Sequence, residues 1–303
     1  MNQHIFRVDL KNGDVTESWL KFCINIQLLR LIDQAHGGVG LKHVTKGAVE
    51  ALQIPLPPLA EQKRIAGILD AADALRKQRR EALAQLDTLL QSTFLDMFGD
   101  PVTNPMGWET DSLNNHGNLK NGLNFSSSEN GNDLLCLGVG DFKSRWCVDD
   151  VANLSTISLN AVPSNEYLLQ DGDLVFVRSN GNRALVGRCL VIYPREVAVT
   201  FSGFCIRYRP ESEELAPTYL AHLFQSDSMK CAMLGVGKGA NIQNINQKVL
   251  NALNILKPPR DLQQRFTSIV ESIEQQKARM QSHLEELDTL FASLQSRAFN
   301  GEL

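Results

Sequence analysis

Residues 51–65, ALQIPLPPLAEQKRI, and residues 252–266, ALNILKPPRDLQQRF, are two versions of one segment. Each carries a Pro-Pro pair, a glutamine and an arginine at matching positions that lie 201 residues apart. Farther along, the tetrapeptide LDTL occurs at 86–89 and again at 287–290. One shared tetrapeptide can arise by chance, but several matches in a single register indicate a duplicated domain with a connector.

The duplication extends in both directions from these segments. With a shift of one residue, HIFRVDL at 4–10 resembles FCIRYRP at 204–210. Residues 1–100 therefore correspond to residues 201–303. The intervening stretch, about 101–200, has no counterpart elsewhere in the chain.

A long helix is expected after each Pro-Pro pair, over residues 61–98 and 260–300. Apolar residues return there at three- and four-residue steps, which is typical of an amphipathic helix. A residue that precedes proline avoids the helical region, so each helix should be entered from extended chain. At 1.5 Å per residue the first helix would span about 55 Å. A helix of that length with one apolar stripe needs a partner, and we expect the two copies to pack as an antiparallel coiled coil.

Four basic residues gather on the first predicted helix, and two interpretations stay open for them. They either face DNA or belong to a solvated helix surface that nearby carboxylates balance. The four residues are Arg76, Lys77, Arg79 and Arg80.

The pattern of residue types is different between Pro101 and about Pro258. Short apolar runs such as LLCLGVG, DGDLVFV and ALVGRCLVIY alternate with Gly, Asn, Asp and Ser, which predicts strands joined by turns. A helical stretch is expected near Pro217–Leu234. The fold class expected is therefore a mixed α/β domain plus long antiparallel coiled-coil helices.

Two polar, glycine-bearing loops are candidate binding elements. Residues 174–195 contain four arginines and no acidic residue, and the hexapeptide RSNGNR lies within them at 178–183. Arginine can bind guanine or phosphate through two hydrogen bonds, and asparagine can bind adenine in the same way. The second loop, GVGKGANIQNINQ at 235–247, carries a lysine and several amides. Solvation of an ordinary loop and a flexible turn before a strand are the respective alternatives.

Composition and motifs argue against an enzyme. The net charge of −4 does not suggest a protein that coats nucleic acid, and six separated cysteines suggest reduced thiols. GVGKGA lacks the spacing and hydroxyl of a phosphate-binding loop. The Pro-Pro pairs follow Leu56 and Lys257, where an adenine methyltransferase motif needs Asn or Asp. We expect no catalytic residue, no metal and no cofactor, and a cytoplasmic protein without a signal peptide or membrane span.

The whole chain resembles the specificity subunit of type I restriction–modification systems. The resemblance rests mainly on PLPPLAEQKRIAGILDAAD…LLQSTFLDMFG, with support from GDLVFVRSNGN…VGR and GKGANIQNI. Members of that family carry two target-recognition domains, each of which recognises half of a split DNA site. Two conserved helices form a coiled coil that sets the spacing between the half-sites and binds methyltransferase subunits.

The resemblance implies a domain organisation. Residues 1–50 would be the final third of a first target-recognition domain and 51–100 the first connector helix. Residues 101–258 would form a complete recognition domain, and 259–303 the second connector helix. The partners implied are double-stranded DNA and methyltransferase subunits, with the restriction subunit and a second copy of the chain as further candidates. The side chains expected to contact DNA are Lys143, Arg145, Arg178, Asn180, Asn182, Arg183, Arg188, Lys238, Asn241, Gln243 and Asn244.

The chain departs from the family pattern because most of a first recognition domain is missing before residue 51. An apolar stretch over residues 19–31 should then need another surface. Self-association would cover it, a second gene product is the rival, and packing against the chain's own coiled coil is the third alternative. For the function, the alternative is a structural coiled-coil assembly protein without DNA recognition of its own.

Overall fold

The computed structural model describes residues 7–11, 13–34, 46–142, 145–235 and 244–303, without the side chains of 29–34. The chain divides into two compact units. We call residues 1–86 with 275–303 the helix unit, and residues 87–274 the sheet unit. Each unit is described by itself.

Two long helices are confirmed where the sequence predicts them. Helix α3 covers Leu59–Phe98 and helix α7 covers Arg260–Asn300, and both begin directly after a Pro-Pro pair. The interior of both helices is free of proline, the residue that breaks helices. The one glycine, Gly67, has open space around it, so it marks no close contact.

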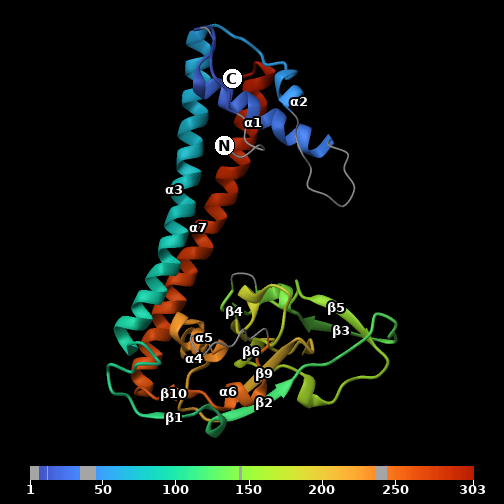
Figure 1. Ribbon diagram of the computed structural model, residues 1–303, viewed down its shortest axis with the longest axis vertical. Coiled ribbons are helices and arrows are strands. Elements are labelled where there is room, and N and C mark those ends of the chain that lie inside the picture. Colours follow the sequence, from blue (N-terminus) through green and yellow to red (C-terminus); the bar gives the residue numbers. More distant parts are fainter. Residues whose placement is uncertain (1–6, 12, 35–45, 143–144, 236–243) are drawn as a thin grey trace. The chain divides into compact units, whose positions relative to one another are not determined.

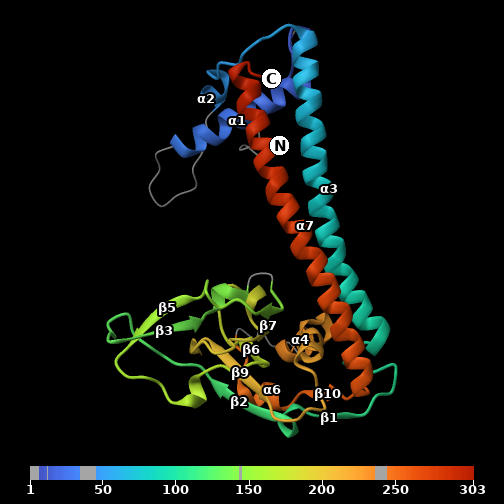
Figure 2. The same ribbon diagram turned by 180° about the vertical axis from the view of Figure 1, so that it is seen from behind.

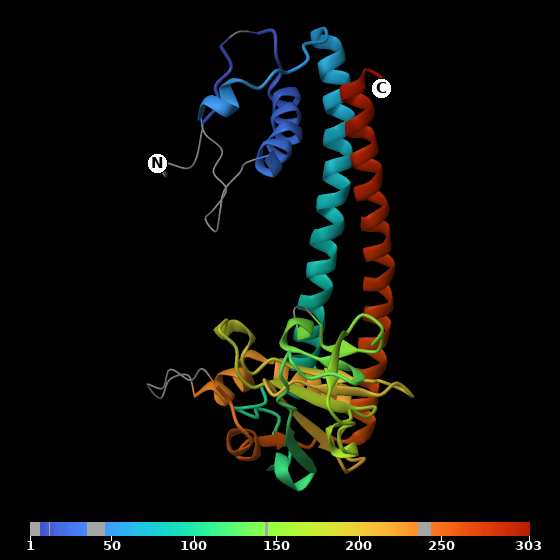
Figure 3. The ribbon, with the colours of Figure 1, turned by 90° about the vertical axis from the view of Figure 1, so that its right-hand side faces the viewer.

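The expected antiparallel pairing of α3 and α7 is present in each unit. In the helix unit, Ile65 and Leu69 of α3 share a core with Phe291 of α7, and Figures 1 and 3 show these helix segments side by side. In the sheet unit, Phe94 of α3 packs edge-on against Phe266 of α7, with ring centroids 5.6 Å apart. The early part of α3 thus meets the late part of α7, and the late part of α3 meets the early part of α7.

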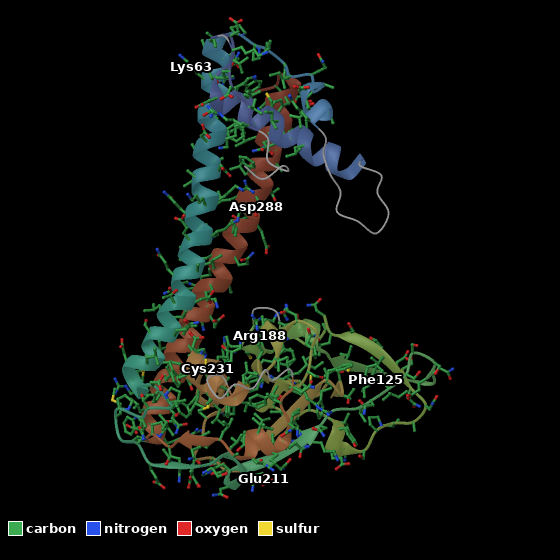
Figure 4. All side chains as sticks on the ribbon, viewed as in Figure 1. Lys63, Phe125, Arg188, Glu211, Cys231 and Asp288 are labelled. Carbon is green, nitrogen blue, oxygen red and sulfur yellow. The ribbon has the colours of Figure 1, made fainter. Side chains whose placement is uncertain are left out.

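Ion pairs on the helix surface account for much of the basic cluster on α3. The guanidinium of Arg76 lies 2.5 Å from Asp288 of α7 and 4.2 Å from the ring centroid of Phe291. Arg80 also pairs with Asp288, which is labelled in Figure 4, at 2.8 Å. These two arginines therefore link α3 to α7 through Asp288. This agrees with the interpretation of a solvated helix surface whose charges are balanced by carboxylates.

The N-terminal apolar stretch packs on the helices of its own unit. Helix α1 (Glu17–Gln34) buries Trp19, Phe22 and Cys23 in the core of the helix unit, and the short helix α2 covers Lys46–Glu50. Of the three alternatives for this stretch, packing against the chain's own long helices is therefore the one that these three side chains adopt. The side chains of Leu29 and Leu31 lie outside the described residues.

The sheet unit contains the strands that the sequence predicts. A five-stranded sheet has the order β2-β9-β6-β7-β4, a three-stranded sheet has the order β5-β3-β8, and β1 pairs with β10. Figure 2 shows these strands from behind. All pairs are antiparallel except β3 with β8 and β4 with β7. The strands are β1 (Thr110–Ser112), β2 (Gly117–Asn121), β3 (Asn132–Leu137), β4 (Cys147–Val148), β5 (Ser155–Leu159), β6 (Asp173–Val177), β7 (Cys189–Ile192), β8 (Val199–Phe201), β9 (Cys205–Pro210) and β10 (Asn254–Leu256).

The sheet unit also contains short helices. One cluster of its core is formed by side chains of strands from both larger sheets, such as Leu137 of β3 and Val175 of β6. Every residue of β6 is buried, and four of its five residues form the continuous apolar run LVFV. The predicted helical stretch forms α4 and α5, which the cap residue Ser226 separates. The helices are α4 (Pro217–Gln225), α5 (Asp227–Leu234) and α6 (Gln247–Asn251), with 3₁₀ turns η1 (Leu113–Asn115), η2 (Val139–Phe142), η3 (Asn165–Tyr167) and η4 (Arg183–Leu185).

A buried glutamine at the start of α3 joins the entry of that helix to the chain before α1. The side chain of Gln62 is fully buried. Its amide oxygen accepts the backbone N–H of Thr16 at 3.0 Å. Its amide nitrogen donates to the backbone oxygens of Asp14 and Pro57, at 2.8 and 2.9 Å.

The second copy repeats this network at the start of α7. The buried amide of Gln263 accepts the N–H of Ala216 at 2.8 Å and donates to the oxygens of Glu214 and Pro258, both at 2.9 Å. Pro258 lies 201 residues after Pro57, whereas Glu214 and Ala216 lie 200 residues after Asp14 and Thr16, which is the one-residue shift seen in the sequence match. The duplication is therefore visible in the structure, and it explains why glutamine occurs in both copies.

Candidate nucleic-acid interface

Several connecting segments leave the sheets at one end of the sheet unit. The last residue of β6, Val177, pairs with the first residue of β9, Cys205. The last residues of β3 and β8, Leu137 and Phe201, also lie side by side. The segments that follow these strands therefore gather together. We call residues 138–142, 178–188, 202–204 and 244–245 the loop cluster.

The RSNGNR loop is shaped by its own asparagines. The side-chain oxygen of Asn180 accepts the backbone N–H of Asn182 at 2.7 Å. Asn182 in turn caps η4, because its side-chain oxygen accepts the N–H of Ala184 at 3.0 Å. In both bonds the side-chain amide oxygen is the acceptor. Asn182 and Arg183 are exposed at the tip of the loop.

The loop is tied at its base to two other segments. Arg178 donates its backbone N–H to the oxygen of Phe204 at 2.8 Å, and its guanidinium donates to the oxygen of Gly203 at 3.5 Å. Its own backbone oxygen accepts the N–H of Ile245 at 2.9 Å. Ser179 also forms an antiparallel bridge with Asn244. The structure thus brings the end of the second predicted loop against the first.

Arg188 has a positioning role within this region. Its guanidinium donates to the backbone oxygen of Phe142 at 2.9 Å, which ties the β6–β7 hairpin to η2. Arg188 is labelled in Figure 4. Arg145, three residues beyond Phe142, is exposed. The predicted residues Lys143, Lys238, Asn241 and Gln243 lie outside the described residues.

The four arginines of the acid-free run do not share one surface. Arg178, Arg183 and Arg188 lie in the loop cluster. Arg195 follows the last residue of β7, Ile192, which pairs with the first residue of β6, so it lies at the opposite end of the hairpin. There it pairs with Asp171 at 2.9 Å.

The loop cluster carries a positive formal charge. Its only carboxylate among the described residues is Asp141, which accepts the N–H of Gly138 at 2.8 Å. A further cation, Lys230 of α5, was missed in the sequence because it lies in a helix and outside both glycine-bearing loops. Its ammonium donates to the backbone oxygen of Ala184, at 3.3 Å, and so lies beside the arginine-bearing loop.

The described residues contain no group of three His, Cys, Asp or Glu side chains arranged to hold a metal ion. Burial raises the pKa of the Cys136 and Cys147 thiols to about 12, so these thiols are protonated at neutral pH. Within the same part of the chain, no helix is both long and apolar enough to cross a membrane.

Comparison with known proteins decides the family. Residues 1–85 and 105–288 match the family model described as the type I restriction modification DNA specificity domain. The chain belongs to this family. The resemblance seen in the sequence is therefore confirmed.

Individual relatives of the type I specificity family agree with this assignment. The specificity subunit of the type I restriction enzyme StySPI from Salmonella potsdam is 27% identical over 301 residues, which are 90% of this chain and 62% of the relative. The EcoKI specificity subunit of Escherichia coli K12 is 26% identical over 295 residues, with the same two coverages. The chain therefore spans less than two thirds of the length of these relatives.

The fold of this family member also matches a solved structure. A chain from a structural study of complex assembly and conformational transition of the type I R-M system aligns with a TM-score of 0.61 at 21% identity. The alignment covers 95% of this chain and 72% of that chain. The expected fold class, an α/β domain with long antiparallel helices, is confirmed.

Proposed function

We propose that this chain is a non-catalytic subunit that recognises a specific double-stranded DNA sequence for a type I restriction–modification complex. The observation that carries the proposal is the loop cluster, where three arginines and several amides lie at one end of the sheets. Membership of the specificity family supports the same function. Residues 101–258 are the recognition domain in this proposal, and 51–100 and 259–303 carry the connector helices.

Different arginines of the loop cluster have different roles. Arg183 is exposed at the loop tip, beside the cap of η4, where it can reach a base edge or a phosphate. Arg178 is half-buried at the base of the loop and adds charge there. Arg188 holds the hairpin to η2 and so orients the loop. Bidentate contacts to a base give specificity, whereas contacts to phosphate give affinity for any sequence.

The other proposed partners are methyltransferase subunits, with the restriction subunit and a second copy of this chain as candidates. Exposed leucines on the long helices support a protein partner there, since Leu75 and Leu89 of α3 and Leu290 of α7 are about half exposed. Sedimentation of the chain with and without methyltransferase subunits would give the stoichiometry. A strictly monomeric chain whose complex holds one copy would exclude self-association.

The Arg178→Ala and Arg183→Ala variants should each weaken binding of the assembled subunit to its DNA. The probe is a duplex enriched from a random-sequence pool, compared with a scrambled duplex. A lost base contact should cost about 1–3 kcal/mol on the enriched duplex only. A lost phosphate contact should weaken both duplexes and flatten the salt dependence.

Arg195→Gly is the matched control, because it removes an arginine of the same run at the opposite end of the hairpin. Its backbone φ of 58° suits glycine, so the change should not strain the chain. Unchanged affinity and salt dependence in both Arg178→Ala and Arg183→Ala would contradict the proposal. The outcome would then favour a structural coiled-coil protein.

A further inference from the structure

One aromatic ring projects from the loop cluster without a place in the core. Phe204 is 62% exposed, whereas Phe201, three residues earlier, is fully buried. Phe204 occupies the third position of a tight turn in which the N–H of Cys205 donates to the oxygen of Ser202 at 2.8 Å. The turn joins β8 to β9, so the ring stands at the end of the sheets beside the arginine-bearing loop.

The turn that carries this ring is held from two sides. The backbone oxygen of Phe204 accepts the N–H groups of Arg178 and Ser179, at 2.8 and 3.4 Å. On the other side, the N–H of Gly203 donates to the oxygen of Leu123 at 2.6 Å. A Cβ atom at Gly203 would lie 2.0 Å from the side-chain oxygen of Asn124 and 3.0 Å from the backbone oxygen of Leu123, so a larger residue would require these groups to shift. The ring is therefore presented by a fixed backbone.

The surroundings of the ring suit a nucleobase better than a protein. Protein-docking surfaces have a contiguous apolar centre. Among the described residues of the loop cluster, Phe204 is the only large apolar side chain that is exposed. Beside its turn lie the guanidinium of Arg178, which donates to the oxygen of Gly203, and the side-chain oxygen of Asn124. An isolated ring among cations and amides fits DNA, because every base offers a π-face and every phosphate a charge.

We propose that Phe204 inserts into the base stack of the bound duplex as an apolar wedge, next to the bases that the arginine-bearing loop contacts. This inference rests on the proposed DNA-recognition function. Apolar side chains that enter the duplex unstack a base step and kink the DNA. Pyrimidine–purine steps unstack most readily, so insertion makes the subunit sensitive to a step with which it forms no hydrogen bond.

The test places 2-aminopurine, a base whose fluorescence rises when it is unstacked, at successive positions of a duplex enriched from a random-sequence pool. The assembled wild-type subunit should raise the fluorescence at one pyrimidine–purine step. Phe204→Ala should abolish that rise and weaken binding about five- to 150-fold. Phe204→Tyr, which keeps the ring, should restore both properties.

A second measurement ties the effect to the DNA step. Replacing the pyrimidine–purine step with a stiffer one should weaken wild-type binding more than Phe204→Ala binding. Val162→Ala is the matched control, since Val162 is 73% exposed and lies outside the loop cluster. It should leave fluorescence and affinity unchanged.

Three outcomes would overturn the inference. If Phe204→Ala keeps the affinity and the fluorescence rise, the ring does not enter the stack. If the variant binds DNA normally but loses a methyltransferase subunit, the ring contacts protein. If wild-type protein prefers no duplex at all, the proposed function itself fails and the inference fails with it.

Discussion

Replacing Arg209 with methionine is expected to lower the free energy of unfolding by about 3 kcal/mol, because the change leaves a buried carboxylate without its cation. Asp173 at the start of β6 is fully buried. It accepts the Nε and Nη2 of Arg209 at 2.8 and 2.6 Å, and the backbone N–H of Gln170 at 2.7 Å. Arg207 lies two residues before Arg209 on β9 and keeps some positive charge near Asp173. The loss of unfolding free energy should therefore lie at the lower end of the range for a broken buried ion pair.

Chemical denaturation followed by circular dichroism measures this loss. The exposed pair of Arg195 with Asp171 provides the control, since exposed ion pairs contribute at most about 1 kcal/mol. Arg195→Gly should therefore unfold close to the wild-type midpoint. Equal losses in Arg209→Met and Arg195→Gly would show that burial of Asp173 does not govern the stability of this sheet.

Gln263→Leu is expected to cost about 3 kcal/mol of the free energy of unfolding. Leucine has a similar size, but it cannot accept the N–H of Ala216 or donate to the oxygens of Glu214 and Pro258. Buried backbone groups left without a partner cost about 1–3 kcal/mol each, and local relaxation recovers part of the total. The measurement is again chemical denaturation of the full chain.

The neighbouring residue supplies the control for this substitution. Gln264 is exposed near the start of α7, so Gln264→Leu should change the stability by no more than about 0.5 kcal/mol. Gln62→Leu should be as harmful as Gln263→Leu, because it removes the equivalent network in the helix unit. Equal effects of Gln263→Leu and Gln264→Leu would mean that the buried amides do not secure the helix entries.

The helices and their pairing were predictable because the signal is long and repeated. The apolar stripe of α3 and α7 continues over some ten turns, and the duplication gives both helices the same register. The matching of Gln62 with Gln263 was also visible. Their burial was not, because glutamine is usually exposed and only the folded chain shows which backbone groups need its amide.

The arrangement of the candidate site could be predicted only in part. RSNGNR was identified from its residue types. That Arg178 and Arg195 lie at opposite ends of the hairpin follows only from the antiparallel pairing of β6 with β7. The run ALVGRCLVIY suggested one strand, yet its first part closes the hairpin through η4 and only Cys189–Ile192 is strand. Phe204 has the same local composition as the buried Phe201, so no pattern in the sequence distinguishes the exposed ring from the core ring.

Selection from a random-sequence duplex pool shows directly whether the chain recognises a specific DNA sequence. The full chain, assembled with methyltransferase subunits, is mixed with the pool, and bound duplexes are sequenced after successive rounds. We expect the wild-type chain to enrich one sequence and the Arg178→Ala, Arg183→Ala double variant to relax or lose that enrichment. A wild-type chain that enriches no sequence, or a double variant that enriches the same sequence equally well, would contradict this expectation.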